Sequence, residues 1–379
     1  MKMKLKKREV KRSTRTQYNV DFLKDRNPPD ITPAEEVLQI NCERPSKAEI
    51  EKAIHHTKRG KASGPDKIPA EAIKADIETS TEILHDLFEK IWEQEEIPTE
   101  WKEEYLVKLP KKGDMQDCKN FRGIMLLSVP GKVLNKVILE RLKTGVDAKL
   151  RDHQAGFRKD RSCTDQIATL RIIVEQSMEW NSSLYINFVN FEKVFDSLDR
   201  DTLWKLLQHY AIPDKLISLI RNSYEDMACR VILAGQLTDS FMVKTGMRQG
   251  CLLSPFLFLL AIDWIMKKTN RRNGIQWTPG SQLEDLDFAD DLALLSHSHQ
   301  QMQEKTELLN TVSTQLGLNI NRSKTRIMKA NTKNNNPITM NGEPLEETES
   351  FTYLGSTINK HGDTEEDVKK SKQELHSSC

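Results

Sequence analysis

Two adjacent carboxylates, Asp290 and Asp291, lie between two apolar segments of the 379-residue chain, and this arrangement restricts the fold more than any other feature. The segments Leu283–Phe288 and Leu292–Ser296 predict a β-hairpin with Ala289-Asp290-Asp291 at its tip. Like charges this close raise each other's pKa unless a cation is present. An Asp-rich turn is common by itself, but a pair anchored in a buried sheet favours a divalent metal, since Mg²⁺ prefers carboxylate oxygens and phosphates.

The rest of the chain predicts an irregular mixture of helices and short strands. Residues 183–189 predict a strand, with Leu184, Ile186 and Phe188 on one face and Tyr185 and Asn187 on the other. Helices are expected over about residues 80–95, 201–209, 254–268 and 300–315. Thr79 with Glu82 resembles a capping box at the start of the first. This irregular order favours an α+β fold over a doubly wound parallel sheet.

Composition excludes several classes of protein. Hydrophobic residues make up 37% of the chain and charged residues 30%, which fits a folded, highly charged protein better than a disordered one. The longest apolar run, Phe256–Ile262, is too short to span a membrane, so no membrane partner is expected. The six cysteines show no CxxC spacing and give no support to a zinc site or a disulfide framework. With no signal peptide, localisation is left open between nucleus and cytoplasm.

The formal net charge is only +1, but residues 1–16 carry eight basic side chains and one acidic one. This stretch is either a nucleic-acid contact or nuclear address, or a solvated tail, and the sequence favours neither. Three prolines in residues 26–34 indicate a linker. Residues 1–45 are therefore expected to form a basic N-terminal arm and linker.

Motifs along the chain stand in the order of one known family. They are NFRGI (120–124), QAGFR (154–158), FVNFEKVFD (188–196), RQGCLLSP (248–255), FADD (288–291), GLNIN (317–321) with Lys324, and FTYLG (351–355). Together they resemble the reverse transcriptases, over about residues 46–360. GKASGPDKIP (60–69) and LPKKGD (109–114) are typical of the non-long-terminal-repeat, LINE-type retrotransposons.

The resemblance implies a right-hand polymerase fold with helical and β fingers (46–183) and an antiparallel-sheet palm (184–345). Residues 346–379 would form the primer-grip region and the start of a truncated thumb, so that most of the thumb is missing. The implied partners are an RNA template, a DNA primer and a deoxynucleoside triphosphate. The implied cofactors are two Mg²⁺ ions bound by Asp290 and Asp291, with Mn²⁺ as an alternative.

The resemblance also assigns roles to single residues. Nucleotide binding falls to Lys111, Arg122, Phe195, Gln249 and Gly250; nucleic-acid binding to Arg158, Arg248, Tyr353 and Gly355; and the general acid for pyrophosphate to Lys324. Without the resemblance, Lys111, Arg122 and Lys324 would be interpreted as surface charges, and Phe195 as a core side chain.

Asn190 departs from the family pattern, which has its first metal-binding aspartate at this position. An amide keeps the shape of the side chain but loses its charge, and Mg²⁺ is poorly held by neutral side chains. A loss of about 4 kcal/mol of stabilisation would lower turnover roughly 10³-fold. The expected function is therefore an impaired RNA-directed DNA polymerase, and the alternative is a catalytically dead retroelement remnant that only binds nucleic acid.

Overall fold

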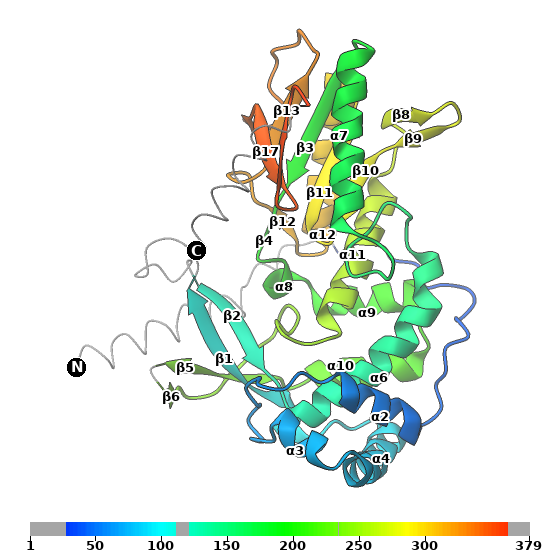
Figure 1. Cartoon of the computed structure of the whole chain (residues 1–379), viewed down its shortest axis with the longest axis vertical. Coiled ribbons are helices and arrows are strands. Elements are labelled where there is room, and N and C mark those ends of the chain that lie inside the picture. The colour runs from blue at the N-terminus through cyan, green and yellow to red at the C-terminus, as the bar shows by residue number, and fades with distance from the viewer. Residues whose placement is uncertain (1–27, 111–120, 234, 363–379) are drawn as a thin grey trace, which may run out of the picture. The chain divides into compact units, whose positions relative to one another are not determined.

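The chain was analysed as a computed structural model, which describes residues 28–110, 121–233 and 235–362 (Figure 1). It divides into two compact units, and each is made of two chain segments. Unit 1 comprises Met1–Lys149 with Phe195–Leu257, and unit 2 comprises Leu150–Val194 with Phe258–Cys379. The fingers, palm and primer-grip regions expected from the sequence are each one continuous segment, and this division into two units does not test their boundaries. Those boundaries stay a prediction.

Unit 1 is largely helical. Its helices are α2 (Lys47–His56), α3 (Ala70–Ala75), α4 (Ile77–Gln94), α5 (Thr99–Lys102), α6 (Val129–Val146), η3 (Asp147–Lys149), α8 (Val194–Ser197, from Phe195 onward), α9 (Arg200–His209) and α10 (Asp214–Tyr224). A capping box between Ser46 and Glu49 starts α2. The predicted capping box at Thr79 is wrong, because α4 begins two residues earlier and its N-cap, Asp76, accepts a hydrogen bond from the Thr79 N–H at 3.0 Å.

A mixed sheet completes unit 1. Its strands are β1 (Glu103–Pro110), β2 (Phe121–Leu126), β5 (Ala228–Leu233), β6 (Gln236–Leu237) and β7 (Phe241–Met242). Strand β1 pairs antiparallel with β2 and parallel with β5, which also pairs with β6 and β7.

Unit 2 is built around a sheet with the strand order β10-β11-β3-β13-β16. These strands are β3 (Leu184–Val189), β10 (Asp285–Phe288), β11 (Asp291–Ser296), β13 (Arg326–Ala330) and β16 (Glu346–Glu347). Around it lie α7 (Cys163–Glu179), most of α11 (Ser254–Thr269), α12 (His299–Gln315) and the short strands β4 (Phe191–Glu192), β8 (Ile275–Thr278), β9 (Ser281–Leu283), β12 (Asn319–Ile320), β14 (Thr339–Met340), β15 (Glu343–Pro344), β17 (Ser350–Tyr353) and β18 (Ser356–Asn359).

The predicted strand at 183–189 is confirmed as β3, the middle strand of this sheet. Its predicted alternation holds, although every one of its residues is buried, because both faces of the sheet are covered. Leu184, Ile186 and Phe188 belong to a core with the apolar face of α7. On the other face, Asn187 donates a hydrogen bond to Thr306 of α12 at 2.9 Å. Figure 1 shows α7 and α12 on opposite sides of the sheet.

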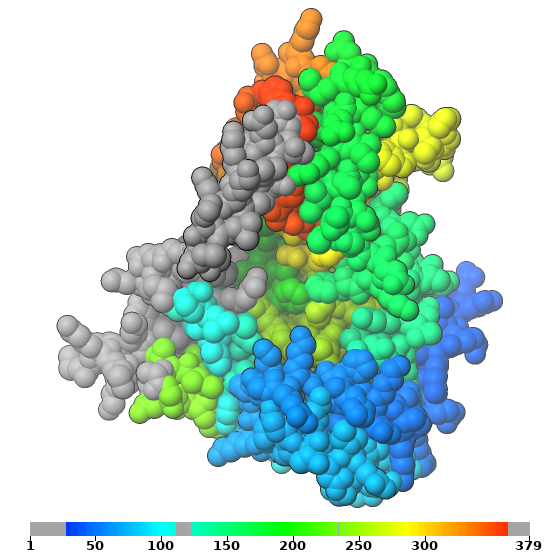
Figure 2. Space-filling view, viewed as in Figure 1, coloured from blue at the N-terminus to red at the C-terminus, as the bar shows by residue number. Residues whose placement is uncertain are grey.

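The predicted hairpin at 283–296 is also confirmed, with β10 and β11 as its arms. Leu283 instead ends β9, whose hairpin with β8 projects from unit 2 (Figure 2). The predicted helices at 201–209, 254–268 and 300–315 are found as α9, α11 and α12. Within the described residues, no helix combines the length and apolar character that crossing a bilayer requires.

Candidate active site

The two aspartates lie at the end of the β10–β11 hairpin. Phe288 pairs with Asp291, so the connecting loop has two residues, Ala289 and Asp290, and Asp291 is the first residue of β11. Ala289 has a φ of +59°, in the left-handed region that non-glycine residues seldom adopt outside tight turns. Asp290 is partly exposed and Asp291 is exposed, so the tip is in contact with solvent.

Position 190 is next to this tip in the strand register. Strands β3 and β11 are antiparallel, and Val189 lies opposite Leu292. The next residue on each strand, Asn190 and Asp291, continues this register at the same end of the sheet. The backbone of Asn190 is fixed there, because its N–H donates to Thr325 Oγ1 at 3.3 Å and its carbonyl accepts from the Asn321 N–H at 2.7 Å.

The tip carries an unfavourable concentration of negative charge. The pKa of Asp291 is raised to about 6, first because surrounding protein removes water from its carboxylate and second because Asp290 is adjacent. A bound cation would relieve this repulsion. However, the described part of the chain has no group of three or more His, Cys, Asp or Glu side chains placed to hold a metal ion. The tip therefore offers two carboxylates, and Asn190 lies opposite Asp291 in the continued strand register.

A buried cluster of charged side chains contacts β10, the first arm of the hairpin. The guanidinium of Arg151 binds Asp285 at 2.8 Å and 3.0 Å and also binds Asp287, both in β10. The backbone N–H of Arg151 donates to Asp263 of α11 at 2.8 Å. Burial, and then Asp285, raise the pKa of Asp287 well above its usual range, although Arg151 opposes them. We did not expect this cluster from the sequence, since Arg151 stands among basic residues typical of a solvated surface.

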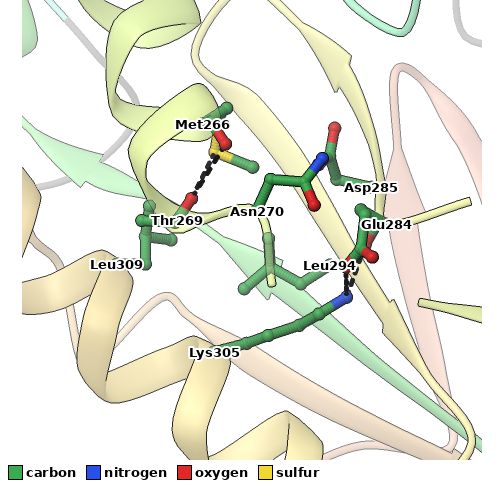
Figure 3. A pocket seen from close by; sticks show the side chains of 8 residues that line it. All are labelled: Met266, Thr269, Asn270, Glu284, Asp285, Leu294, Lys305 and Leu309. Atoms are coloured by element: carbon green, nitrogen blue, oxygen red, sulfur yellow. Dashed lines mark hydrogen bonds and ion pairs between the residues drawn. The ribbon is translucent and has the colours of Figure 1, made fainter. Parts of the chain in front are cut away.

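A second buried ion pair lies at the base of the same hairpin (Figure 3). Lys305 of α12 binds the carboxylate of Glu284 at 2.6 Å and donates to the Leu295 carbonyl at 2.7 Å. A cavity of about 10 Å³ beside this pair is lined by Asp285 and Leu294 among others, and it has room for about one water molecule. Both ends of the hairpin are thus held by buried polar contacts.

Lys324, the predicted general acid, is exposed on the loop between β12 and β13. The same loop contains Asn321, whose N–H binds the carbonyl of Asn190. The loop that carries Lys324 is therefore tied directly to position 190, and the catalytic role of this lysine stays a prediction.

Three of the predicted nucleotide-binding residues come together within unit 1. Gln249 donates to Asp196 Oδ1 at 2.8 Å, and the Met247 N–H donates to the Phe195 carbonyl at 2.6 Å, so the RQG segment contacts α8. Gly250 has a φ of +109°, and a Cβ there would lie 2.9 Å from the Met125 carbonyl oxygen in β2.

The two predicted triphosphate-binding residues are Arg122 and Lys111. Arg122 belongs to β2, the strand whose Met125 N–H donates to the Gln249 carbonyl at 2.8 Å. Lys111 lies outside the described residues.

Two of the predicted nucleic-acid-binding residues are buried within the protein, and their role in binding stays a prediction. Arg248 is buried against Glu104, at 2.6 Å, and the ring of Tyr224. Tyr353 is buried in the unit 2 core, where its hydroxyl donates to the Leu286 carbonyl at 3.1 Å.

Arg158 donates to the carbonyls of Arg151 and Gln154 at 2.7 Å and 3.1 Å. Arg158 itself is partly exposed, and Gly355, at the β17–β18 turn, has open space where a side chain would lie.

A sheet of four antiparallel strands with one short parallel strand at its edge, an acidic hairpin at one end and helices on both faces is the arrangement of a polymerase-type palm. Residues 109–358 match the family described as reverse transcriptase (RNA-dependent DNA polymerase), and the chain belongs to this family. The family uses divalent metal ions, in agreement with the acidic tip.

Relatives of the chain come from retrotransposable elements. It is 26% identical over 278 residues to the transposon TX1 uncharacterized 149 kDa protein of Xenopus laevis, covering 73% of this chain and 21% of the relative. It is 26% identical to the Pol polyprotein of element R2DM from Drosophila melanogaster (57% of this chain, 20% of the relative). It is 22% identical to the RNA-directed DNA polymerase from the Drosophila melanogaster mobile element jockey (82% and 35%). The chain thus spans only about a fifth to a third of each relative.

A solved structure supports the fold. Apo telomerase from Candida tropicalis, truncated from its C-terminal domain, matches with a TM-score of 0.50 and 14% sequence identity, over 74% of this chain and 60% of that one. The predicted α+β class and right-hand polymerase fold are confirmed. The predicted relationship to non-long-terminal-repeat retrotransposon reverse transcriptases is confirmed as well.

Proposed function

We propose that the chain is the RNA-directed DNA polymerase domain of a non-long-terminal-repeat retrotransposon. It would add deoxynucleotides to the 3′ end of a DNA primer on an RNA template. The observation that carries this proposal is the acidic pair of the matched family region at the tip of a palm hairpin, with position 190 next to it in register. The RNA, the primer and the nucleotide are the partners that this activity requires.

Asp290 and Asp291 would hold the metal ions, with Mg²⁺ as the expected ion and Mn²⁺ as a substitute. When bound, the ions supply Lewis-acid activation of the primer 3′ hydroxyl and neutralise charge on the leaving pyrophosphate. Lys324 would deliver a proton to that pyrophosphate. Phe195 would pack under C2′ of the sugar and exclude a 2′-hydroxyl.

The remaining predicted residues would bind the nucleotide. Gly250 lacks a side chain and so allows close approach of the backbone, and Gln249 offers an amide for hydrogen bonding. Arg122 and Lys111 would bind triphosphate oxygens, Arg with two parallel hydrogen bonds and Lys as a point charge.

Asn190 favours a second candidate function, a protein that binds nucleic acid without extending a primer. Its neutral amide stands where a third carboxylate would complete the acidic site, and the described residues contain no three-ligand cluster. Since Mg²⁺ binds poorly to neutral side chains, the unmodified chain, called the parent below, is expected to be a weak polymerase.

Primer extension on a homopolymer RNA template, with Mg²⁺ and separately with Mn²⁺, tests the proposal. Asn190→Asp should raise the extension rate on the order of 10³-fold over the parent chain. Asn334→Asp is the matched control, because it adds the same charge on the loop between β13 and β14 and its carboxylate keeps the acceptor that the Asn336 N–H uses. This control should leave the rate unchanged.

The outcomes separate the two functions. Strong extension by the parent chain would refute the claim that Asn190 is disabling. RNA binding by both the parent and Asn190→Asp, with extension by neither, would favour the binding-only function.

A further inference from the structure

The segment 154–156 lies along the free edge of β10 and reaches the hairpin tip. Ala155 donates its N–H to the Asp287 carbonyl at 2.9 Å, and Gln154 forms an isolated parallel bridge with Asp287. Strand β10 is the edge strand of the unit 2 sheet, so this segment pairs with an edge that would otherwise be open. It ends beside the loop that carries Asp290.

The side chain of Gln154 binds the tip itself. It is fully buried, and its Oε1 accepts hydrogen bonds from the Ala289 N–H at 3.1 Å and the Gly156 N–H at 2.9 Å. Within the described residues its Nε2 has no hydrogen-bond partner. A buried donor without a partner costs folding free energy. The stabilising contribution of the Gln154 side chain therefore comes from the two hydrogen bonds that its Oε1 accepts.

Gly156 brings the two backbones unusually close together. A Cβ at Gly156 would lie 2.2 Å from the Ala289 nitrogen, which no real side chain allows. Ala289 has the positive φ that turns the chain toward Asp290 and Asp291. The bond from its N–H to Gln154 therefore fixes the residue whose backbone angles decide where the two carboxylates lie.

The segment is itself held rigidly. Arg151, at its start, is bound to Asp263, Asp285 and Asp287, and Arg158, at its end, binds the carbonyls of Arg151 and Gln154. These contacts hold Gln154 in place, and its hydrogen bond to the Ala289 N–H in turn holds the hairpin loop.

We propose that Gln154 is a positioning residue of the polymerase site: it holds the Ala289 turn so that Asp290 and Asp291 converge on the metal ions. This inference rests on the proposed function, because it assumes that the two aspartates bind metal. Gln154 touches neither substrate nor metal in this role and acts only through the hairpin backbone.

The test compares Gln154→Met, which keeps the volume and removes the acceptor, with Gln303→Met as matched control. Gln303 of α12 lies in the same unit, and its Oε1 also accepts a backbone N–H, that of Thr339 in β14 at 2.8 Å. Two quantities are measured for each folded variant: amide hydrogen exchange of residues 288–291, and Mn²⁺ affinity. Gln154→Met should speed exchange at least tenfold and weaken Mn²⁺ binding about tenfold, whereas Gln303→Met should change neither.

Gln154→Glu adds a rescue, because it restores the acceptor and should restore slow exchange. Unchanged exchange at residues 288–291 in a folded Gln154→Met variant would overturn the inference. If the parent chain and Asn190→Asp both fail to bind Mn²⁺, the proposed metal site is wrong, while the exchange measurement still decides whether Gln154 holds the turn.

Discussion

At the scale of single residues, burial gives Arg151 a role that its neighbours in the chain do not indicate. Its guanidinium binds Asp285 and Asp287, and its Nε lies 3.7 Å from Asp263. A basic side chain is usually exposed, so the sequence did not predict this cluster. The acidic pair at the hairpin tip could be predicted, because apolar segments flank it on both sides.

The buried guanidinium of Arg141 makes a prediction about pH and stability. Arg141 binds Glu49 through Nε and Nη2 at 2.7 Å and 2.8 Å, and this bond lowers the pKa of Glu49 to about 2 from an ordinary value near 4.5. Because the folded-state pKa is the lower one, the stabilisation is complete above about pH 5 and is lost as pH falls toward 2. Partial exposure of Glu49 limits the effect to about 1–2 kcal/mol.

Urea unfolding of the parent and Glu49→Gln, at pH 7 and at pH 3, measures this effect. The difference in unfolding free energy should be about 1–2 kcal/mol at pH 7 and smaller at pH 3. Glu51→Gln, on an exposed position of the same helix, is the control and should differ little from the parent at either pH. A difference between parent and Glu49→Gln that grows as pH falls would contradict the assigned sign.

At the scale of elements, hydrophobic periodicity predicted which segments are helices and strands, but local chemistry decided their ends. The α4 helix was expected from about residue 80 with Thr79 as its N-cap, yet it begins at Ile77 because Asp76 provides the N-cap acceptor. The order of strands in the palm sheet could not be predicted from periodicity, since β3 pairs with β11 and β13, which lie more than a hundred residues further along the chain.

The corrected helix start predicts a measurable loss of stability. Asp76→Ala removes the acceptor for the Thr79 N–H and should lower the unfolding free energy by about 1 kcal/mol. Glu82→Ala removes only an exposed ion pair with Lys47 and should cost a few tenths of a kcal/mol. Chemical denaturation of both variants distinguishes the two starts, and a larger loss from Glu82→Ala would support the rejected capping box.

At the scale of the whole molecule, charge is divided unevenly along a chain that is nearly neutral. Residues 1–16 contribute a net +7 to a total of +1, so residues 17–379 carry a formal net charge of −6. Nucleic acid is attracted mainly by the positive charge that neutralises its phosphates. Residues 17–379, which are acidic overall, can bind nucleic acid through local basic clusters. A long-range electrostatic attraction of nucleic acid would come from residues 1–16.

Deleting residues 1–16 should therefore weaken RNA binding roughly tenfold at 0.1 M salt and make the dependence of affinity on salt concentration shallower. A second variant, with the eight Lys and Arg residues of this stretch changed to Gln, keeps its length and should reproduce both effects if charge is the cause. Binding measured by fluorescence anisotropy across a salt series gives the slope for each protein. An identical slope in all three would show that the phosphate contacts come from the body of the chain and that the basic stretch is a solvated tail.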